Sequence, residues 1–243
     1  MKEGKEKDLS SRKQTELFDG ESFRYITSHL EDPVYEVNMH PKSLNQKDLD
    51  SILDVGCGNG SFLKNWQKHF KINYAVGVEP SQKGVSVLKR KWENDKKIRF
   101  ESAYAHQLPF ESDSFDLVTN WSVLHWIGRN EYLQSIGEMI RVCSKYLCLM
   151  DFVASKDYRN KYHHKEGLFT YKQDFDDIVS ASGLMKKIEI LQWWVDPLDG
   201  KIKLLSNKDL QRFENNKLSF SSRKLVVYEK DFSLLPLKDE SDF

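Results

Sequence analysis

A chain of 243 residues has room for one large α/β domain, or for one core with a smaller appendage. Its hydrophobic content of 39% and aromatic content of 12% exclude an intrinsically disordered chain. Lys and Arg number 37, and so do Asp and Glu. The resulting formal net charge of zero argues against a broadly basic surface for nucleic acid.

Cysteine content and hydropathy indicate a cytoplasmic protein. The three cysteines are odd in number and form no CxxC pair, so we expect free thiols in a reducing compartment. No run approaches the roughly 18 apolar residues that a membrane span needs. The first residues also lack the apolar core of a signal peptide. We therefore expect no contact with a membrane.

The first 50 residues are expected to contain a tail and a cap. Residues 1–14 are mostly charged or polar, which predicts a flexible tail. Residues 15–50 mix aromatic and acidic side chains with a weak helical periodicity, which predicts a small N-terminal helical cap. A regular pattern begins at residue 51.

Between residues 51 and 152, short apolar runs alternate with amphipathic segments of helical length. This alternation is typical of a parallel sheet covered by helices on both faces. Ser81 is the expected N-cap of the second helix. Strands are expected at residues 51–55, 74–79, 97–103, 115–121 and 145–152, and helices at residues 61–70, 81–95 and 130–143.

The last third of the chain has a different pattern. Residues 174–184 predict a helix that ends at Gly183. Apolar strands are expected at residues 186–195 and 222–232. Because no clear helix separates these two strands, we expect them to pair antiparallel at the edge of the sheet.

The predicted fold is therefore a doubly wound, mostly parallel, Rossmann-like α/β sheet of seven strands. It has an antiparallel edge hairpin and the small N-terminal helical cap. Residues 15–243 would form a single domain. Within it, residues 51–152 are the expected cofactor-binding core, and residues 153–243 are the expected sheet edge and substrate-pocket region.

Three glycines directly follow the first expected strand, in "ILDVGCGNGSF". Ligands of open α/β sheets bind beyond the carboxyl ends of the strands, which places this segment at the binding crevice. A dinucleotide needs G-x-G-x-x-G, whereas Gly56, Gly58 and Gly60 give G-x-G-x-G. Asp54 lies just upstream and favours a cationic ligand over a diphosphate. Glu79 ends the second strand, where a carboxylate accepts hydrogen bonds from both hydroxyls of a ribose.

These features resemble the class I S-adenosylmethionine-dependent methyltransferases, in particular the group with an "LPF…FD" signature. The resemblance covers about residues 50–152, through "ILDVGCGNGSF", "VGVEPS", "YAHQLPFESDSFD" and "FDLVTNWSVLHWI". It implies methyl transfer as the activity and S-adenosyl-L-methionine as the cofactor. The cofactor-binding residues that it implies are Asp54, Gly56, Cys57, Gly58, Gly60, Glu79, Pro80, Tyr104, Ala105, His106, Asn120 and Trp121.

The resemblance also implies which part of the cofactor each of these residues contacts. The glycine loop would wrap the methionine part, with Asp54 supporting the loop and the amino group. Ala105 and His106 would flank the adenine. Tyr104 stands where the family often has Asp, so the usual hydrogen bond to the adenine amino group is not expected. Residues 120–122 would line the sulfonium and the transferred methyl group.

Three histidines are candidates for catalysis. His125 follows the fourth strand and would act as a base or orient the substrate; its alternative is packing under Trp126. His163 and His164 follow the fifth strand, in a region that often contributes to the acceptor pocket of the family. Adjacent histidines point in different directions and no further ligands have suitable spacing, so no metal site is expected.

The expected acceptor is a small polar metabolite that is methylated on oxygen, at a hydroxyl, a carboxylate or a sugar. No "NPPY" or "DPPY" follows the fourth strand, the pattern associated with methylation of amide or base nitrogens, and "SVLHWI" is similar to segments of small-molecule and carboxylate methyltransferases. One alternative is a nucleic-acid or protein methyltransferase, with residues 88–99 as its basic patch. Another is a non-catalytic partner protein that binds S-adenosylmethionine. A monomer or homodimer is expected.

Overall fold

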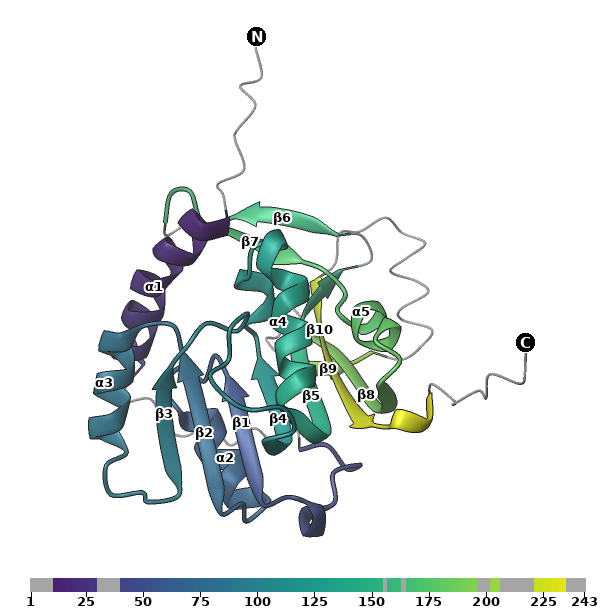
Figure 1. Ribbon diagram of the computed structural model, residues 1–243. Helices are drawn as coiled ribbons and strands as arrows, with labels where there is room; N and C mark the ends of the chain where they lie inside the picture. Colours follow the sequence, from purple (N-terminus) through teal and green to yellow (C-terminus); the bar gives the residue numbers. More distant parts are fainter. Residues whose placement is uncertain are drawn as a thin grey trace.

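An eight-stranded sheet forms the centre of the protein (Figure 1). Its strand order is β3-β2-β1-β4-β5-β10-β8-β9, and β6 and β7 form a separate two-stranded sheet. These counts refer to the residues that the computed structural model describes, which are 11–29, 40–154, 157–162, 165–195, 202–205 and 221–234.

The half of the sheet from β3 to β5 is parallel throughout. Ser81 caps the second connecting helix as predicted, because its side chain accepts a hydrogen bond from the backbone N–H of Gly84. The predicted elements of this half are confirmed, with ends that shift by a few residues. The strands are β1 (Ser51–Val55), β2 (Tyr74–Glu79), β3 (Ile98–Ser102), β4 (Phe115–Trp121) and β5 (Cys143–Ala154), and the helices are α2 (Ser61–His69), α3 (Gln82–Lys91) and α4 (Arg129–Val142). A short 3-10 helix that was not predicted, η2 (Leu124–Trp126), follows β4.

The other half of the sheet is antiparallel. Strand β10 (Ser221–Lys230) lies between β5 and β8 (Met185–Val195) and runs antiparallel to both. The predicted antiparallel pairing is confirmed, but the sheet has eight strands rather than seven. The additional edge strand is β9 (Ile202–Leu204), which pairs with β8. Three residues are too few to show the alternation by which a strand is recognised in a sequence.

Shorter elements complete the described chain. Strands β6 (Tyr158–Lys161) and β7 (Phe169–Lys172) pair antiparallel after β5. Helix α5 (Asp176–Ala181) then leads to β8, and it is shorter than the predicted helix. Two 3-10 helices, η1 (Gln46–Asp48) and η3 (Phe232–Leu234), lie before β1 and after β10.

Two apolar cores flank the sheet. On one face, α4 and α5 pack through residues such as Ile136 and Val179. On the other face, α1 (Ser11–Ser28), α2 and α3 pack through Ile26, Trp66 and Leu88. Helix α1 begins inside the segment expected to be a tail, and residues 1–10 and 30–39 lie outside the described residues. The protein is therefore a layered α/β structure with helices on both faces.

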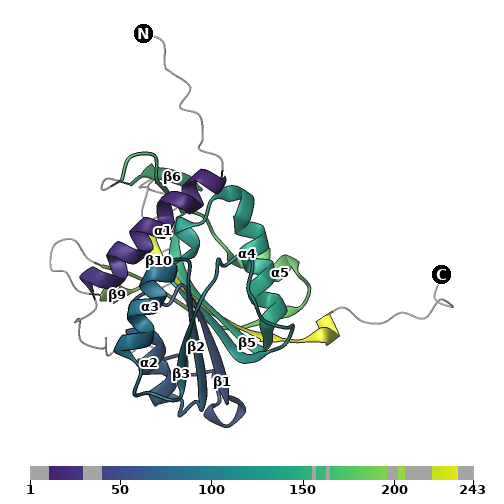
Figure 2. The same cartoon turned by 60° about the vertical axis from the view of Figure 1, so that its left-hand side comes forward.

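Helix α1 and the β6–β7 sheet lie at the end of the molecule where the parallel strands end. Both ribbon views show α1 running beside α3 at this end (Figures 1 and 2). Figure 1 also places β6 above the tips of the strands. Because ligands of open α/β sheets bind beyond these strand ends, α1 and β6 are in position to cover a binding site.

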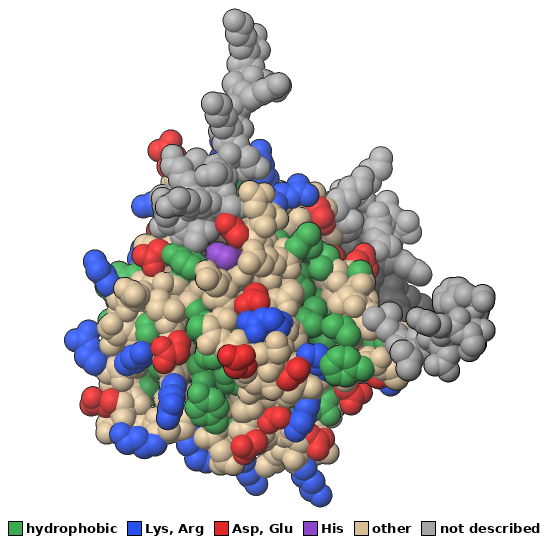
Figure 3. Space-filling view, viewed as in Figure 1, with side chains coloured by type: hydrophobic (Ala, Val, Ile, Leu, Met, Phe, Trp, Pro, Cys, Tyr) green, Lys and Arg blue, Asp and Glu red, His purple; other side chains and the backbone are tan. Residues whose placement is uncertain are grey.

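The surface carries charges of both signs. On the face shown in Figure 3, Lys and Arg side chains are interspersed with Asp and Glu side chains. Among the described residues, no helix has the length and apolar character needed to cross a membrane. The cysteines Cys57, Cys143 and Cys148 are buried and free.

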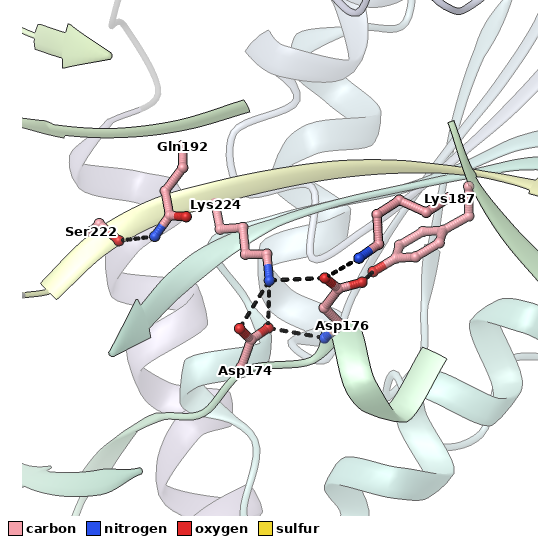
Figure 4. A network of polar contacts seen from close by, with 7 residues as sticks. Asp174, Asp176, Lys187, Gln192, Ser222 and Lys224 are labelled. Atoms are coloured by element: carbon pink, nitrogen blue, oxygen red, sulfur yellow. Dashed lines mark hydrogen bonds and ion pairs between the residues drawn. The ribbon is translucent and has the colours of Figure 1, made fainter. Parts of the chain in front are cut away.

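A buried polar network joins α5 to β8 and β10 (Figure 4). Asp176 accepts hydrogen bonds from Lys187 at 2.6 Å, from Lys224 at 3.0 Å and from the Tyr228 hydroxyl at 2.7 Å. Lys224 also donates to both carboxylate oxygens of Asp174, at 2.9 and 3.1 Å. Burial alone would raise the pKa of Asp176, but hydrogen bonds from Lys187, Tyr228 and Lys224 hold it below its usual value.

We expect Asp176→Asn to lower the free energy of unfolding at pH 7 by about 3 kcal/mol, because two lysines lose their shared anion. Since the folded pKa of Asp176 is lowered, its contribution is complete above pH ~4 and is lost as the pH falls through the folded value. Denaturant unfolding at several pH values measures both effects. Asp177→Asn, an exposed carboxylate on the same helix, is the matched control. Equal stabilities of the two variants at pH 7 would contradict the prediction.

Candidate functional site

The glycine loop after β1 is pressed against the segment that follows β4. Gly56, Gly58 and Gly60 have positive φ angles of 78°, 56° and 79°. A Cβ atom on Gly56 would lie 2.2 Å from Cγ2 of Val123. Only glycine combines this backbone conformation with so close an approach. The loop therefore brings its backbone, rather than side chains, to the end of the sheet.

Glu79 ends β2 directly beside this loop. Its carboxylate accepts hydrogen bonds from the backbone N–H of Gly58 and from the Ser22 hydroxyl of α1, both at 2.6 Å. The residue is 6% exposed, and burial raises the pKa of Glu79 in spite of these two hydrogen bonds. Each carboxylate oxygen retains a lone pair, so the group can still accept a hydrogen bond from a ribose hydroxyl.

Asp54 is the second buried carboxylate at this edge. It is 1% exposed, and its Oδ1 atom has no hydrogen-bond partner among the described residues. Burial, and then the neighbouring charge of Glu79, raise the pKa of Asp54 well above its usual value. A buried, unpaired carboxylate oxygen is costly. A cation or a hydrogen-bond donor placed beside Oδ1 would compensate this burial.

Two adjoining cavities lie at the ends of β1, β2 and β4. They share Gly56, Val123 and Trp126 as lining residues. The first is a mainly apolar slot that also contains Pro80, and the second has a volume of about 490 Å³. That volume is within the usual range for small-molecule sites. The two cavities are positioned to hold two parts of one elongated ligand.

The structure brings most of the predicted cofactor residues to these cavities. Gly60 and Asn120 line neither cavity: Gly60 forms the N-cap of α2, and fully buried Asn120 donates a hydrogen bond to the carbonyl of Val55. The first cavity is lined by Gly56, Pro80, Tyr104, Ala105 and His106, and the second by Asp54, Gly56, Cys57, Gly58, Glu79 and Trp121.

His125 lines the second cavity and is held by a buried carboxylate. Its Nδ1 atom lies 2.7 Å from Oδ1 of Asp151, and its backbone N–H donates to Oδ2 of the same residue at 3.2 Å. The side chains are 6% and 2% exposed. A carboxylate on Nδ1 fixes the proton there, which leaves Nε2 as a proton acceptor. The sequence analysis missed Asp151, although an acidic residue near the end of an apolar strand is a usable signal.

The second cavity is bordered by α1 and by Tyr162, which follows β6. Arg24 of α1 donates a hydrogen bond to the Tyr162 hydroxyl at 3.0 Å and pairs with Glu21. The Tyr162 ring packs edge-on against Trp126, with 4.8 Å between ring centroids. No local sequence pattern predicts this roof, because its partners are far apart in the chain. His163 and His164 lie outside the described residues.

Comparison with known proteins agrees with this geometry. Residues 52–145 match the protein family described as "Methyltransferase domain". The chain is 30% identical over 132 residues to an uncharacterized methyltransferase of Schizosaccharomyces pombe, covering 49% of this chain and 46% of that protein.

Two bacterial relatives carry more specific names. The ubiquinone/menaquinone biosynthesis C-methyltransferase UbiE of Campylobacter jejuni is 28% identical over 102 residues, which are 40% of this chain and 42% of that protein. The ubiquinone biosynthesis O-methyltransferase of Bartonella tribocorum is 29% identical over 108 residues, which are 44% of this chain and 43% of that protein. The chain thus spans less than half the length of these curated relatives in each match.

The fold comparison extends further along the chain. A solved structure of a SAM-dependent methyltransferase from Methanosarcina mazei superposes with a TM-score of 0.56 at 15% identity. The superposition covers 79% of this chain and 98% of that one. Residues 52–145 thus match a methyltransferase domain in sequence, and the fold around them is that of S-adenosylmethionine-dependent methyltransferases. The cofactor of such domains is S-adenosylmethionine.

The methyltransferase domain has the groups that this cofactor requires. Unpaired Asp54 fits the cationic amino group of the methionine part. Glu79 at the end of β2 fits the ribose hydroxyls. The apolar slot beside Tyr104 and His106 fits the adenine ring, and Trp121 adds an aromatic face for the sulfonium.

We expect Glu79→Gln to weaken S-adenosylmethionine binding by roughly 10–100-fold, because the variant loses a charge-assisted acceptor but keeps the side-chain size. Isothermal titration calorimetry measures the affinity. Glu101→Gln, an exposed position on the neighbouring strand, is the control and should bind like the wild type. Unchanged affinity in Glu79→Gln would rule out this carboxylate as the ribose contact.

S-adenosylmethionine affinity should fall as the pH is lowered through the raised pKa of Asp54. The cationic ligand binds best to the ionised carboxylate, so binding should also release protons. Calorimetry over a pH series, in buffers with different ionisation enthalpies, measures both quantities. Asp54→Asn should bind about tenfold or more weakly and reduce the proton release. Equal proton release in Asp54→Asn and the wild type would refute the assignment.

Proposed function

We propose that this protein is an S-adenosylmethionine-dependent methyltransferase that transfers a methyl group to a hydroxyl of a small polar molecule. The observation that carries the proposal is the His125–Asp151 pair, which is buried at the wall of the same cavity that contains Asp54 and Glu79. A base at that position is what an oxygen acceptor needs, because a neutral hydroxyl must lose its proton as it is methylated.

The mechanism assigns a separate task to each residue. When bound, S-adenosylmethionine supplies a methyl group on a sulfonium, which is already an electrophile. His125 would accept the hydroxyl proton at Nε2, and Asp151 would stabilise the resulting imidazolium through Nδ1–H. The roof formed by Arg24 and Tyr162 would exclude water and hold the acceptor in place.

Two observations support a small acceptor over a macromolecule. The cavity is covered by α1 and Tyr162, so a large substrate would have to displace contacts between distant parts of the chain. On the visible face, acidic and basic side chains are interspersed, which is a poor match to a polyanion (Figure 3). A non-catalytic role is less consistent with the His125–Asp151 pair, which cofactor binding alone does not require.

The test is methyl transfer from S-adenosylmethionine labelled in the methyl group to a panel of small hydroxylated, carboxylated and carbon-acceptor compounds. Mass spectrometry and NMR then identify the methylated atom. This last step matters because the named relatives include both a C- and an O-methyltransferase. Transfer only to carbon, or only to RNA, DNA or protein, would overturn the proposal.

We expect His125→Gln to lower the rate of methyl transfer by about 10²–10⁴-fold while S-adenosylmethionine affinity stays within a few-fold of the wild type. Asp151→Asn should have a smaller effect of the same kind. His69→Gln, on α2 and outside both cavities, is the matched control and should retain the wild-type rate. A rate in His125→Gln equal to that of the control would exclude His125 as the base.

A further inference from the structure

The cavity wall near His125 carries two cations around one aromatic ring. Phe152 of β5 lies directly opposite Arg223 of β10 in the antiparallel register. The Cζ atom of Arg223 is 4.7 Å from the centroid of the Phe152 ring, and the Nζ atom of Lys172 is 4.4 Å from it. Phe152 and Arg223 both line the second cavity, whereas Lys172 of β7 is not among its lining residues.

Neither cation has a carboxylate partner among the described residues. Arg223 forms no ion pair or side-chain hydrogen bond with the described residues, and Lys172 is only 8% exposed. Burial lowers the pKa of Arg223, and it also lowers the pKa of Lys172, although the charge of Asp151 opposes the second effect. Holding a buried lysine and a half-buried arginine around one ring is unfavourable unless an anion binds beside them.

The other charged groups of the cavity have assigned partners or functions. Arg24 is engaged by Glu21 and by Tyr162. Asp54 and Glu79 lie at the glycine loop, where the cationic cofactor would bind. Arg223 is therefore the charged lining group that remains for the acceptor.

His125 lines the same cavity as the glycine-loop carboxylates and Arg223. Its ring packs edge-on against Phe152 with 4.9 Å between centroids, so the imidazole and the guanidinium contact the same aromatic ring. An acceptor whose hydroxyl reaches His125 would have its other polar group near Arg223, because His125 and Arg223 are separated only by the Phe152 ring. Arginine presents a planar pair of donors that matches a carboxylate or a phosphate.

We propose that the methyl acceptor is a small hydroxylated organic anion, and that Arg223 binds its carboxylate or phosphate group. This inference rests on the proposed function, because it assigns the acceptor of the same site. Lys172 adds positive charge from behind the Phe152 ring and strengthens the selection for an anion.

The test measures acceptor binding in the presence of saturating S-adenosylhomocysteine, which occupies the cofactor region. The probes are 4-hydroxyphenylacetate, its uncharged amide, and phenyl phosphate, titrated by calorimetry or by quenching of tryptophan fluorescence. We expect the wild type to bind the carboxylate about tenfold or more tightly than the amide. The relative affinities of 4-hydroxyphenylacetate and phenyl phosphate then distinguish a carboxylate acceptor from a phosphate ester.

Variants at Arg223 identify the group responsible. Arg223→Gln should abolish the preference for the anion over the amide, and Arg223→Lys should restore part of it. Arg99→Gln is the matched control, because Arg99 also lies over an aromatic ring, Tyr74, but on an exposed part of β3 away from the cavity. It should keep the full preference. Binding of S-adenosylhomocysteine to each variant establishes that the site is folded.

The outcomes separate the two proposals. Equal binding of anion and amide by the wild type, no binding of either anion at millimolar concentrations, or an unchanged preference in Arg223→Gln would overturn the anion site. If the wild type fails to bind S-adenosylhomocysteine, the proposed methyltransferase function fails instead. Preference for the anion in that case would still support the Arg223 site.

Discussion

Two carboxylates held out of water at the ends of neighbouring parallel strands are the constraint around which this site is built. Asp54 and Glu79 are nearly inaccessible, and the charge of Glu79 adds to burial in raising the pKa of Asp54. Glu79 is compensated by two hydrogen bonds, whereas Oδ1 of Asp54 has none. Burial of this kind is unfavourable for the protein alone. A cationic ligand with hydroxyl donors would compensate both carboxylates.

The same constraint connects the N-terminal helix to the core. Ser22 donates to Glu79, and four residues later Ile26 packs where Gly84 of α3 has no side chain. A Cβ atom on Gly84 would lie 2.5 Å from Cδ1 of Ile26. Helix α1 is thus held both by a buried carboxylate and by apolar packing. Since it also supplies Arg24 to the roof, loss of the Ser22 contact and opening of the cavity are physically linked.

Local patterns in the sequence predicted what depends on local structure. The bounds of β1, β2 and β4 follow from short apolar runs, and the Ser81 cap follows from a side chain that precedes its helix. Strand β9 and the β6–β7 sheet were missed, because a strand of three or four residues has no measurable period.

The residues of the candidate site also differ in whether a local sequence pattern could predict them. The residues of the glycine loop and Glu79 could be proposed from the sequence because each lies at the end of a predicted strand. Ser22, Tyr162 and Arg223 were missed because they reach the site from distant parts of the chain, and only the tertiary structure brings them to one cavity. Asp151 was missed although it lies near the end of a predicted strand, because its contact with His125 is visible only in the tertiary structure. Gly60 and Asn120 were assigned from a motif, but they support the loop and the strand from outside the cavities.

Strand β10 links the stability of the fold to the charge of the second cavity. Successive residues of a strand point to opposite faces, so Lys224 reaches the polar network of α5 while Arg223 reaches the cavity. Their partners on β5 alternate in the same manner: Asp151 lies opposite Lys224, and Phe152 lies opposite Arg223. A shift of one residue would bury the guanidinium in the network and remove the cation from the cavity. The Asp176 network specifies one register of β10, and that register places the unpaired cation beside the His125 ring.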